Sequence, residues 1–266
     1  MERLPEIGLG TPTDPDACRR AVTAALDTGY RFIDTAQMYD NERAVGAGLA
    51  ESDVPREDVV VATKLAPGNL SPEDVRATTE ESLDRLGLEA VDLLYVHWPR
   101  DTYDPERTLP ALEALRDDGL IDAIGVSNFS PALLDEARSI LDAPIRAHQV
   151  ECHPLCPQSA LRADAARHDT QLVAYSPLGR GELLDHPTLT PLADDLGESV
   201  ATIVLAWLHA KDVVPIPRSA TPAHIETNFA ALDVELPPAA IDRLDAIEDR
   251  YRTVDPDYAV WNDGSA

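Results

Sequence analysis

Apolar residues follow two alternating patterns along the chain. Short apolar runs rich in β-branched and aromatic residues predict strands at residues 7–9, 30–34, 59–64, 91–97, 121–127, 147–151, 171–176 and 213–216. Between these runs, apolar positions recur at helical spacing, which predicts helices at residues 16–26, 109–117, 131–140, 159–167, 199–209 and 221–230. Ser71, followed by a proline and two acids, marks the start of a further helix.

This alternation of strands and helices predicts an α/β fold. No Pro/Gly/Ser-rich tract divides the chain, so the eight units favour a single domain, residues 1–266, built as a closed (β/α)8 barrel, the TIM barrel. A doubly wound open sheet is the alternative, because alternation alone does not distinguish a closed sheet from an open one.

Composition narrows the functional classes. The chain has 48 acidic residues against 22 basic ones and a net charge of −26, which disfavours binding to nucleic-acid phosphates. Only Lys64 and Lys211 are lysines, so the other 20 of the 22 basic residues are arginines. Acidic, lysine-poor surfaces are typical of proteins from salt-accumulating microbes, in which salt screens the self-repulsion of the chain.

The chain also lacks the signals of export. No apolar run approaches the roughly 18 residues that a membrane span requires, and the first residues do not resemble a signal peptide. We therefore expect a cytoplasmic protein without a membrane partner. The odd number of cysteines (Cys18, Cys152 and Cys156) favours free thiols over a disulfide framework.

Polar side chains stand at or after the ends of three consecutive predicted strands. Asp34 ends the second strand, with Tyr39 in the following loop, while Lys64 ends the third and His97 the fourth. Barrel active sites form where strands end, so these four groups are expected to share one pocket. Each alone is more simply a cap or a packing residue. Lys64 is the exception, because a buried ammonium requires a partner, which Asp34 is placed to supply.

Several segments in register resemble the aldo-keto reductases, with a pattern closest to the bacterial and archaeal branch that includes diketogluconate reductases. They are residues 29–42 (GYRFIDTAQMYDNE), 92–99 (DLLYVHWP), 124–129 (IGVSNF), 149–154 (QVECHP), 174–179 (AYSPLG) and 215–219 (PIPRS). This resemblance implies reduction of small carbonyl compounds with NAD(P)H, with Tyr39 as the general acid. Lys64 would favour the ionised phenol, Asp34 would fix the lysine, and His97 would orient the carbonyl oxygen.

The resemblance also implies a cofactor site. Ser127, Asn128 and Gln149 match the residues that hold the nicotinamide carboxamide, and Tyr175 matches the ring that stacks on the nicotinamide. The remaining expected cofactor contacts are Ser176, Leu178, Gly179, Arg218, Ser219, His224 and Asn228.

The adenosine end departs from the family pattern. His224 stands where an arginine is usual, and Thr227 stands where a glutamate precedes Asn228. Arg218 and Ser219 still suit a 2′-phosphate, because a guanidinium binds phosphate through two hydrogen bonds. We expect NADPH, with NADH also possible.

The substrate site is expected to include Met38, Trp98 and Trp261, the last of these in a C-terminal tail at residues 246–266. Their other interpretation is ordinary packing. The family is mostly monomeric, so a monomer is expected. No metal is expected: Cys152, His153 and Cys156 lack a second ligand pair at zinc spacing.

Two other functions stay open. One is a Schiff-base aldolase that uses Lys64 as the amine. The other is a regulatory subunit of the same fold that binds the cofactor and acts on a partner protein.

Overall fold

Eight parallel strands form the centre of the computed structural model, which describes residues 3–262. The strands are β1 (Leu9–Gly10), β2 (Phe32–Asp34), β3 (Val60–Leu65), β4 (Val91–Val96), β5 (Ile121–Ser127), β6 (Ile145–Glu151), β7 (Gln171–Tyr175) and β8 (Val213–Pro215). Each strand pairs in parallel with the next, in sequence order.

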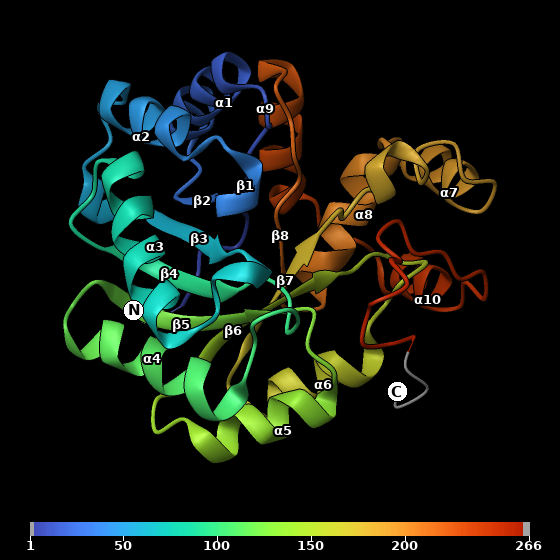
Figure 1. Ribbon diagram of the computed structural model, residues 1–266. Helices are drawn as coiled ribbons and strands as arrows, with labels where there is room; N and C mark the ends of the chain where they lie inside the picture. The colour runs from blue at the N-terminus through green and yellow to red at the C-terminus, as the bar shows by residue number, and fades with distance from the viewer. Residues whose placement is uncertain (1–2, 263–266) are drawn as a thin grey trace.

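Helices surround the strands (Figure 1). They are α1 (Pro15–Thr28), α2 (Glu42–Glu51), α3 (Pro72–Leu86), α4 (Pro105–Asp117), α5 (Pro131–Ile140), α6 (Ser159–His168), α7 (Leu189–Leu196), α8 (Val200–Ala210), α9 (Pro222–Ala230) and α10 (Pro238–Asp245). Within residues 3–262, no helix has the length and apolar character needed to cross a membrane.

The sheet closes between its first and last strands. The Gly8 amide donates to the Pro215 carbonyl at 2.9 Å, and the Gly10 amide donates to the Pro217 carbonyl at 3.2 Å. A β-carbon at Gly10 would lie 2.7 Å from the Ile216 carbonyl oxygen, so only glycine permits this approach. The predicted (β/α)8 barrel is confirmed, and the open doubly wound sheet is excluded.

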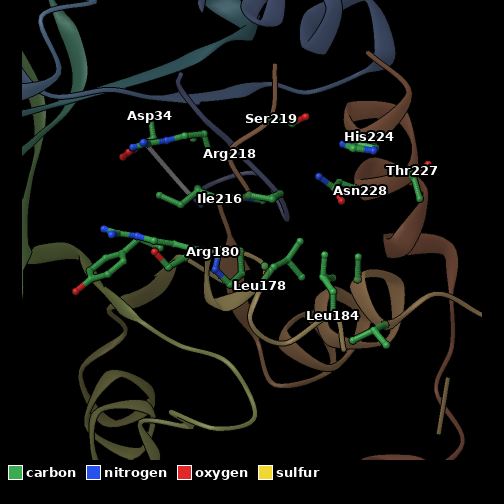
Figure 2. A pocket seen from close by; sticks show the side chains of 18 of the residues that line it. Asp34, Leu178, Arg180, Leu184, Ile216, Arg218, Ser219, His224, Thr227 and Asn228 are labelled. Carbon is green, nitrogen blue, oxygen red and sulfur yellow. The ribbon is translucent and has the colours of Figure 1, made fainter. Parts of the chain in front are cut away.

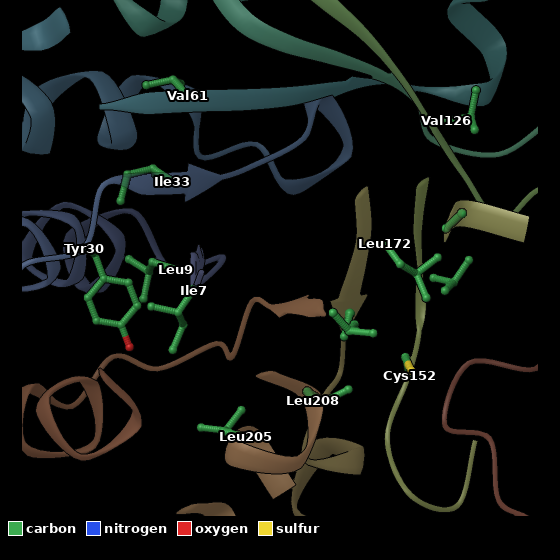
Figure 3. Packing of buried hydrophobic residues seen from close by; sticks show 14 of the residues in the cluster. Ile7, Leu9, Tyr30, Ile33, Val61, Val126, Cys152, Leu172, Leu205 and Leu208 are labelled. Carbon is green, nitrogen blue, oxygen red and sulfur yellow. The ribbon is translucent and has the colours of Figure 1, made fainter. Parts of the chain in front are cut away.

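Alternation along the strands produces two apolar layers. One side of each strand faces the barrel interior, where the buried cluster is Leu4, Phe32, Ala62, Leu93, Tyr95, Ala123, Ala147, Val173, Val214 and Ile216. The other side packs against the helices. Figure 3 shows this outer layer, with Ile33 and Val61 from the strands and Leu205 from α8.

Side-chain caps mark the starts of several helices that the sequence predicted. The Asp14 side chain accepts from the Ala17 amide at the start of α1, and Ser71 caps α3 in the same way. The helix predicted at residues 109–117 begins earlier, at Pro105, because Asp104 caps it.

Three helices, α2, α7 and α10, are not among the predicted ranges. None of the three has a side-chain hydrogen bond at its N-cap. The first strand is also displaced: it spans Leu9–Gly10 rather than residues 7–9.

Candidate functional site

The strand positions that face the barrel interior change from apolar to polar at the C-terminal ends of the strands. Phe32 precedes Asp34 by two residues on β2, and Ala62 precedes Lys64 by two on β3. Successive inward positions in a strand are two residues apart, so each polar side chain lies above an apolar one. His97 follows β4 in the same way, two residues after the inward-facing Tyr95.

Lys64 and Asp34 form a buried ion pair. The Lys64 ammonium donates to Asp34 Oδ1 and, at 2.8 Å, to the Thr35 carbonyl. Gln149 Nε2 donates to the second carboxylate oxygen of Asp34 at 2.7 Å. Lys64 is 0% exposed and Asp34 2%, so the partner that the sequence assigned to Lys64 is confirmed.

Tyr39 lies beside this pair and beside His97. It ends a short 3-10 helix, Gln37–Tyr39, that follows β2. The Tyr39 and His97 rings meet edge to face, with centroids 5.9 Å apart and planes at 82°. Lys64 Nζ lies 5.2 Å from the centroid of the Tyr39 ring. The structure therefore brings the phenol, ammonium, carboxylate and imidazole together.

Burial makes His97 a neutral group. Desolvation, assisted by the nearby Lys64 charge, lowers the pKa of His97 from 6.5 to about 3. At neutral pH the imidazole is thus uncharged, with one ring nitrogen as donor and the other as acceptor. Its Nδ1 atom is buried without a hydrogen-bond partner.

A cavity of about 780 Å³ extends from Tyr39 and Asp34 toward the start of α9 (Figure 2). Of the residues predicted to bind the cofactor, those that line it are Gln149, Tyr175, Ser176, Leu178, Arg218, Ser219, His224 and Asn228. Figure 2 shows Leu178 and Leu184 on one wall, with His224 and Asn228 across from them.

Ser127 and Asn128 lie behind the cavity wall rather than in it. Asn128 accepts a hydrogen bond from the Tyr175 hydroxyl at 2.9 Å and donates to the His97 carbonyl at 3.0 Å. Ser127 donates to the Gln149 carbonyl at 2.8 Å. These two residues therefore connect Tyr175 and Gln149 to the end of β4. The predicted Gly179 does not line the cavity either, and it is buried beside it.

None of the expected substrate residues (Met38, Trp98 and Trp261) lines this cavity. Trp98 is buried. The centroid of its ring lies 5.5 Å from the ring centroid of Tyr258 and 5.6 Å from that of Trp261. Met38 is 55% exposed. The C-terminal tail thus contacts Trp98 through Trp261. Residues 263–266 of the expected tail, 246–266, lie outside the described residues.

Sequence reasoning missed one wall of the cavity. This wall comprises Arg180 and Leu184, which follow β7, and Ser199, Val200 and Ala201 at the start of α8. Arg180 has a φ of 54° and Gly181 a φ of 104°, so the loop turns through left-handed conformations. The Gly-Arg-Gly segment signals such a turn, but not that the turn borders a cavity.

The cysteines are unpaired, as the odd count predicted. Burial raises the pKa of Cys18 to about 12 and that of Cys156 to about 11. Across residues 3–262, no group of three or more His, Cys, Asp or Glu side chains is arranged to hold a metal ion.

Comparisons with known proteins agree with this geometry. Residues 6–249 match the family model described as Aldo/keto reductase family. An aldo-keto reductase of Mycobacterium sp. (strain KMS) is 38% identical over 268 residues, covering 97% of this chain and 94% of the relative.

Solved structures give the same result. The Bombyx mori aldo-keto reductase in complex with NADP is 31% identical and covers 96% of this chain and 92% of its own, with a TM-score of 0.89. A structure named as a candidate 2,5-diketo-D-gluconic acid reductase B is 33% identical, with a TM-score of 0.92. The match covers 96% of this chain and 92% of the other. This chain therefore belongs to the aldo/keto reductase family and is an NAD(P)H-dependent oxidoreductase that reduces carbonyl compounds.

Proposed function

We propose that this enzyme reduces small aldehydes and ketones with NADPH, and that Tyr39 donates the proton. The observation that carries the proposal is the position of Tyr39. It lines the cavity that extends to α9, while its ring contacts Lys64 and His97. When bound, the nicotinamide supplies a hydride to the carbonyl carbon.

The chain's own groups move the proton. The Tyr39 hydroxyl donates to the carbonyl oxygen as the carbon accepts the hydride, and the neighbouring ammonium of Lys64 favours the resulting phenolate. Asp34 holds Lys64 in place and is itself held by Gln149. Neutral His97 donates a hydrogen bond that orients the carbonyl oxygen.

The residues along the cavity fit a nicotinamide dinucleotide. Tyr175 supplies an aromatic face close to Tyr39, and its hydroxyl is fixed by Asn128. The far end offers the N-terminus of α9, a helix of nine residues whose first amides favour an anion. Exposed Arg218 supplies a cation on the same wall.

Arg218 provides the test of cofactor choice. Its guanidinium carbon lies 5.3 Å from the Tyr39 ring centroid, so binding a 2′-phosphate requires this exposed side chain to turn toward α9. We expect Arg218→Ala to lower kcat/KM for NADPH roughly 10- to 100-fold, the value of a hydrogen bond to a charged group. The value for NADH should change little. A wild-type enzyme that strongly prefers NADH would refute the choice of NADPH.

The acidic composition leads to a second prediction. With a net charge of −26, self-repulsion opposes the compact state at low salt. At 1 M salt the Debye length falls to about 3 Å, which screens most of this repulsion. We infer adaptation to high salt and expect the melting temperature to rise steeply from low to molar KCl. An unchanged melting temperature would contradict this inference.

The Schiff-base alternative is weakened by the surroundings of Lys64, whose ammonium donates to both Asp34 and the Thr35 carbonyl. Borohydride trapping with substrate should leave Lys64 unmodified. An assay of NADPH and NADH oxidation with a carbonyl panel at high KCl tests the main proposal. Absence of turnover with every carbonyl would favour the regulatory subunit.

Three further expectations rest on composition and on the family. They are a cytoplasmic location, a monomeric state, and a place in the branch that includes diketogluconate reductases. The last is supported by the structural similarity to the candidate 2,5-diketo-D-gluconic acid reductase B.

A further inference from the structure

The C-terminal segment, residues 251–262, is tied to the end of β6 by its backbone. The amides of Thr253 and Val254 donate to the two carboxylate oxygens of Glu151, at 2.6 Å and 2.8 Å. Just before them, the Tyr251 amide donates to the Leu155 carbonyl at 3.1 Å. A single side chain of the barrel therefore accepts two of the hydrogen bonds that hold this segment.

Glu151 is a buried carboxylate that the reduction mechanism does not use. It is 0% exposed, and His153 Nε2 lies 3.0 Å from Oε1. Burial by itself would raise the pKa of Glu151. The hydrogen bonds from His153, Thr253 and Val254 outweigh this effect and hold the pKa below its ordinary 4.5. The anchor is therefore ionised at neutral pH, when it accepts most strongly.

Contacts continue from this anchor to the active site. Asp255 follows Val254, and its carboxylate accepts from Trp261 Nε1 at 2.8 Å. Trp261 packs against Trp98, which follows His97 in the chain. On the barrel side, Glu151 pairs in register with Tyr175 of the cavity wall. The carboxylate thus stands between the cavity wall and the tail.

We propose that Glu151 is a positioning residue that sets substrate specificity, by holding the C-terminal segment so that Trp261 forms an aromatic wall with Trp98. The substrates that depend on this wall are carbonyl compounds with an aromatic or bulky apolar group. Small aldehydes, which do not reach it, do not depend on Glu151. This inference rests on the proposed reduction and adds a determinant of its substrate range.

The test is the variant Glu151→Gln, which keeps the size of the side chain but replaces one acceptor oxygen with a donor. We expect KM for benzaldehyde to rise about tenfold, as for loss of a hydrogen bond to a charged group. The kcat and KM for propanal and the dissociation constant for NADPH should stay within about twofold. Glu151→Asp keeps the charge and should restore part of the benzaldehyde KM.

Limited trypsin digestion gives a readout that does not depend on activity. The amide of Thr253, in the bond after Arg252, donates to Glu151, so loss of the anchor should expose this bond. We expect cleavage after Arg252 to be about tenfold faster in Glu151→Gln. Cleavage after Arg180, in an exposed loop, serves as the internal reference.

Variants of the tail keep the test decisive if Glu151→Gln does not fold. Asp255→Ala removes the acceptor of Trp261 from an exposed position and should raise KM for benzaldehyde but not for propanal. Asp257→Ala, on the same tail, is the matched control and should change neither.

The outcomes separate the two proposals. The role of Glu151 would be overturned if Glu151→Gln changed the kinetics of both aldehydes equally, or if it changed neither the kinetics nor the trypsin digestion. If Glu151→Gln does not fold, an unchanged KM for benzaldehyde in Asp255→Ala would overturn it. A wild-type enzyme that reduces no carbonyl would instead overturn the proposed function.

Discussion

Replacement of Tyr39 by phenylalanine should lower kcat for carbonyl reduction by about two to four orders of magnitude, the usual contribution of a general acid. The substitution removes only the hydroxyl, so the aromatic contact with His97 should persist. Cofactor binding, measured by quenching of tryptophan fluorescence, should be nearly unchanged.

Tyr258→Phe is the matched control, because Tyr258 lies in the exposed tail and packs on Trp98 through its ring. It should retain nearly full turnover. If Tyr39→Phe kept turnover within a few fold of the wild type, another group would have to supply the proton.

Loss of Lys64 should be the most damaging change to stability. Lys64→Met leaves the Asp34 carboxylate buried without its cation, and breaking a buried ion pair in this way costs about 3–5 kcal/mol. We expect urea unfolding to show a fall of that size in the free energy of unfolding. Turnover should fall as well, because the phenolate of Tyr39 loses the neighbouring ammonium.

The second lysine of the chain provides the control. Lys211 also pairs with an acid, Asp245, but the side chain of that partner is 41% exposed. Ion pairs open to solvent contribute about 0–1 kcal/mol, so Lys211→Met should unfold close to the wild-type midpoint. If Lys64→Met and Lys211→Met lowered the free energy of unfolding by similar amounts, the burial of the Lys64–Asp34 pair would add nothing to stability.

Local patterns predicted most of the fold because the strands and helices have different periods. The same patterns favoured a closed barrel but did not exclude an open sheet, since closure depends on a hydrogen bond between Gly8 and Pro215, more than two hundred residues apart. Gly8, just before β1, and Gly10, within it, carry the relevant signal, but a Gly-Leu-Gly segment is also compatible with several other turns. Helices α2, α7 and α10 were missed, and a missing side-chain cap alone does not explain this, because α6 and α9 also lack one and were predicted.

The site was predictable where it follows strand order. Asp34, Lys64 and His97 stand out because polar side chains end apolar strands, and the structure brings them together with Tyr39. Arg180 was not predictable, because its place on the cavity wall depends on how the loop after β7 folds back. The anchoring role of Glu151 depends on the path of the tail, which no local pattern reveals.

The order of the strands has a consequence for how such an enzyme changes over generations. The groups proposed for proton transfer lie between β2 and the end of β4, in the first hundred residues. The cavity wall toward α9 comes from segments after residue 174. If the proposed cofactor site is correct, mutations in the second half can therefore alter the preferred dinucleotide while the proton-transfer groups stay intact. Under the proposed function, cofactor choice and proton transfer therefore depend on different parts of the chain.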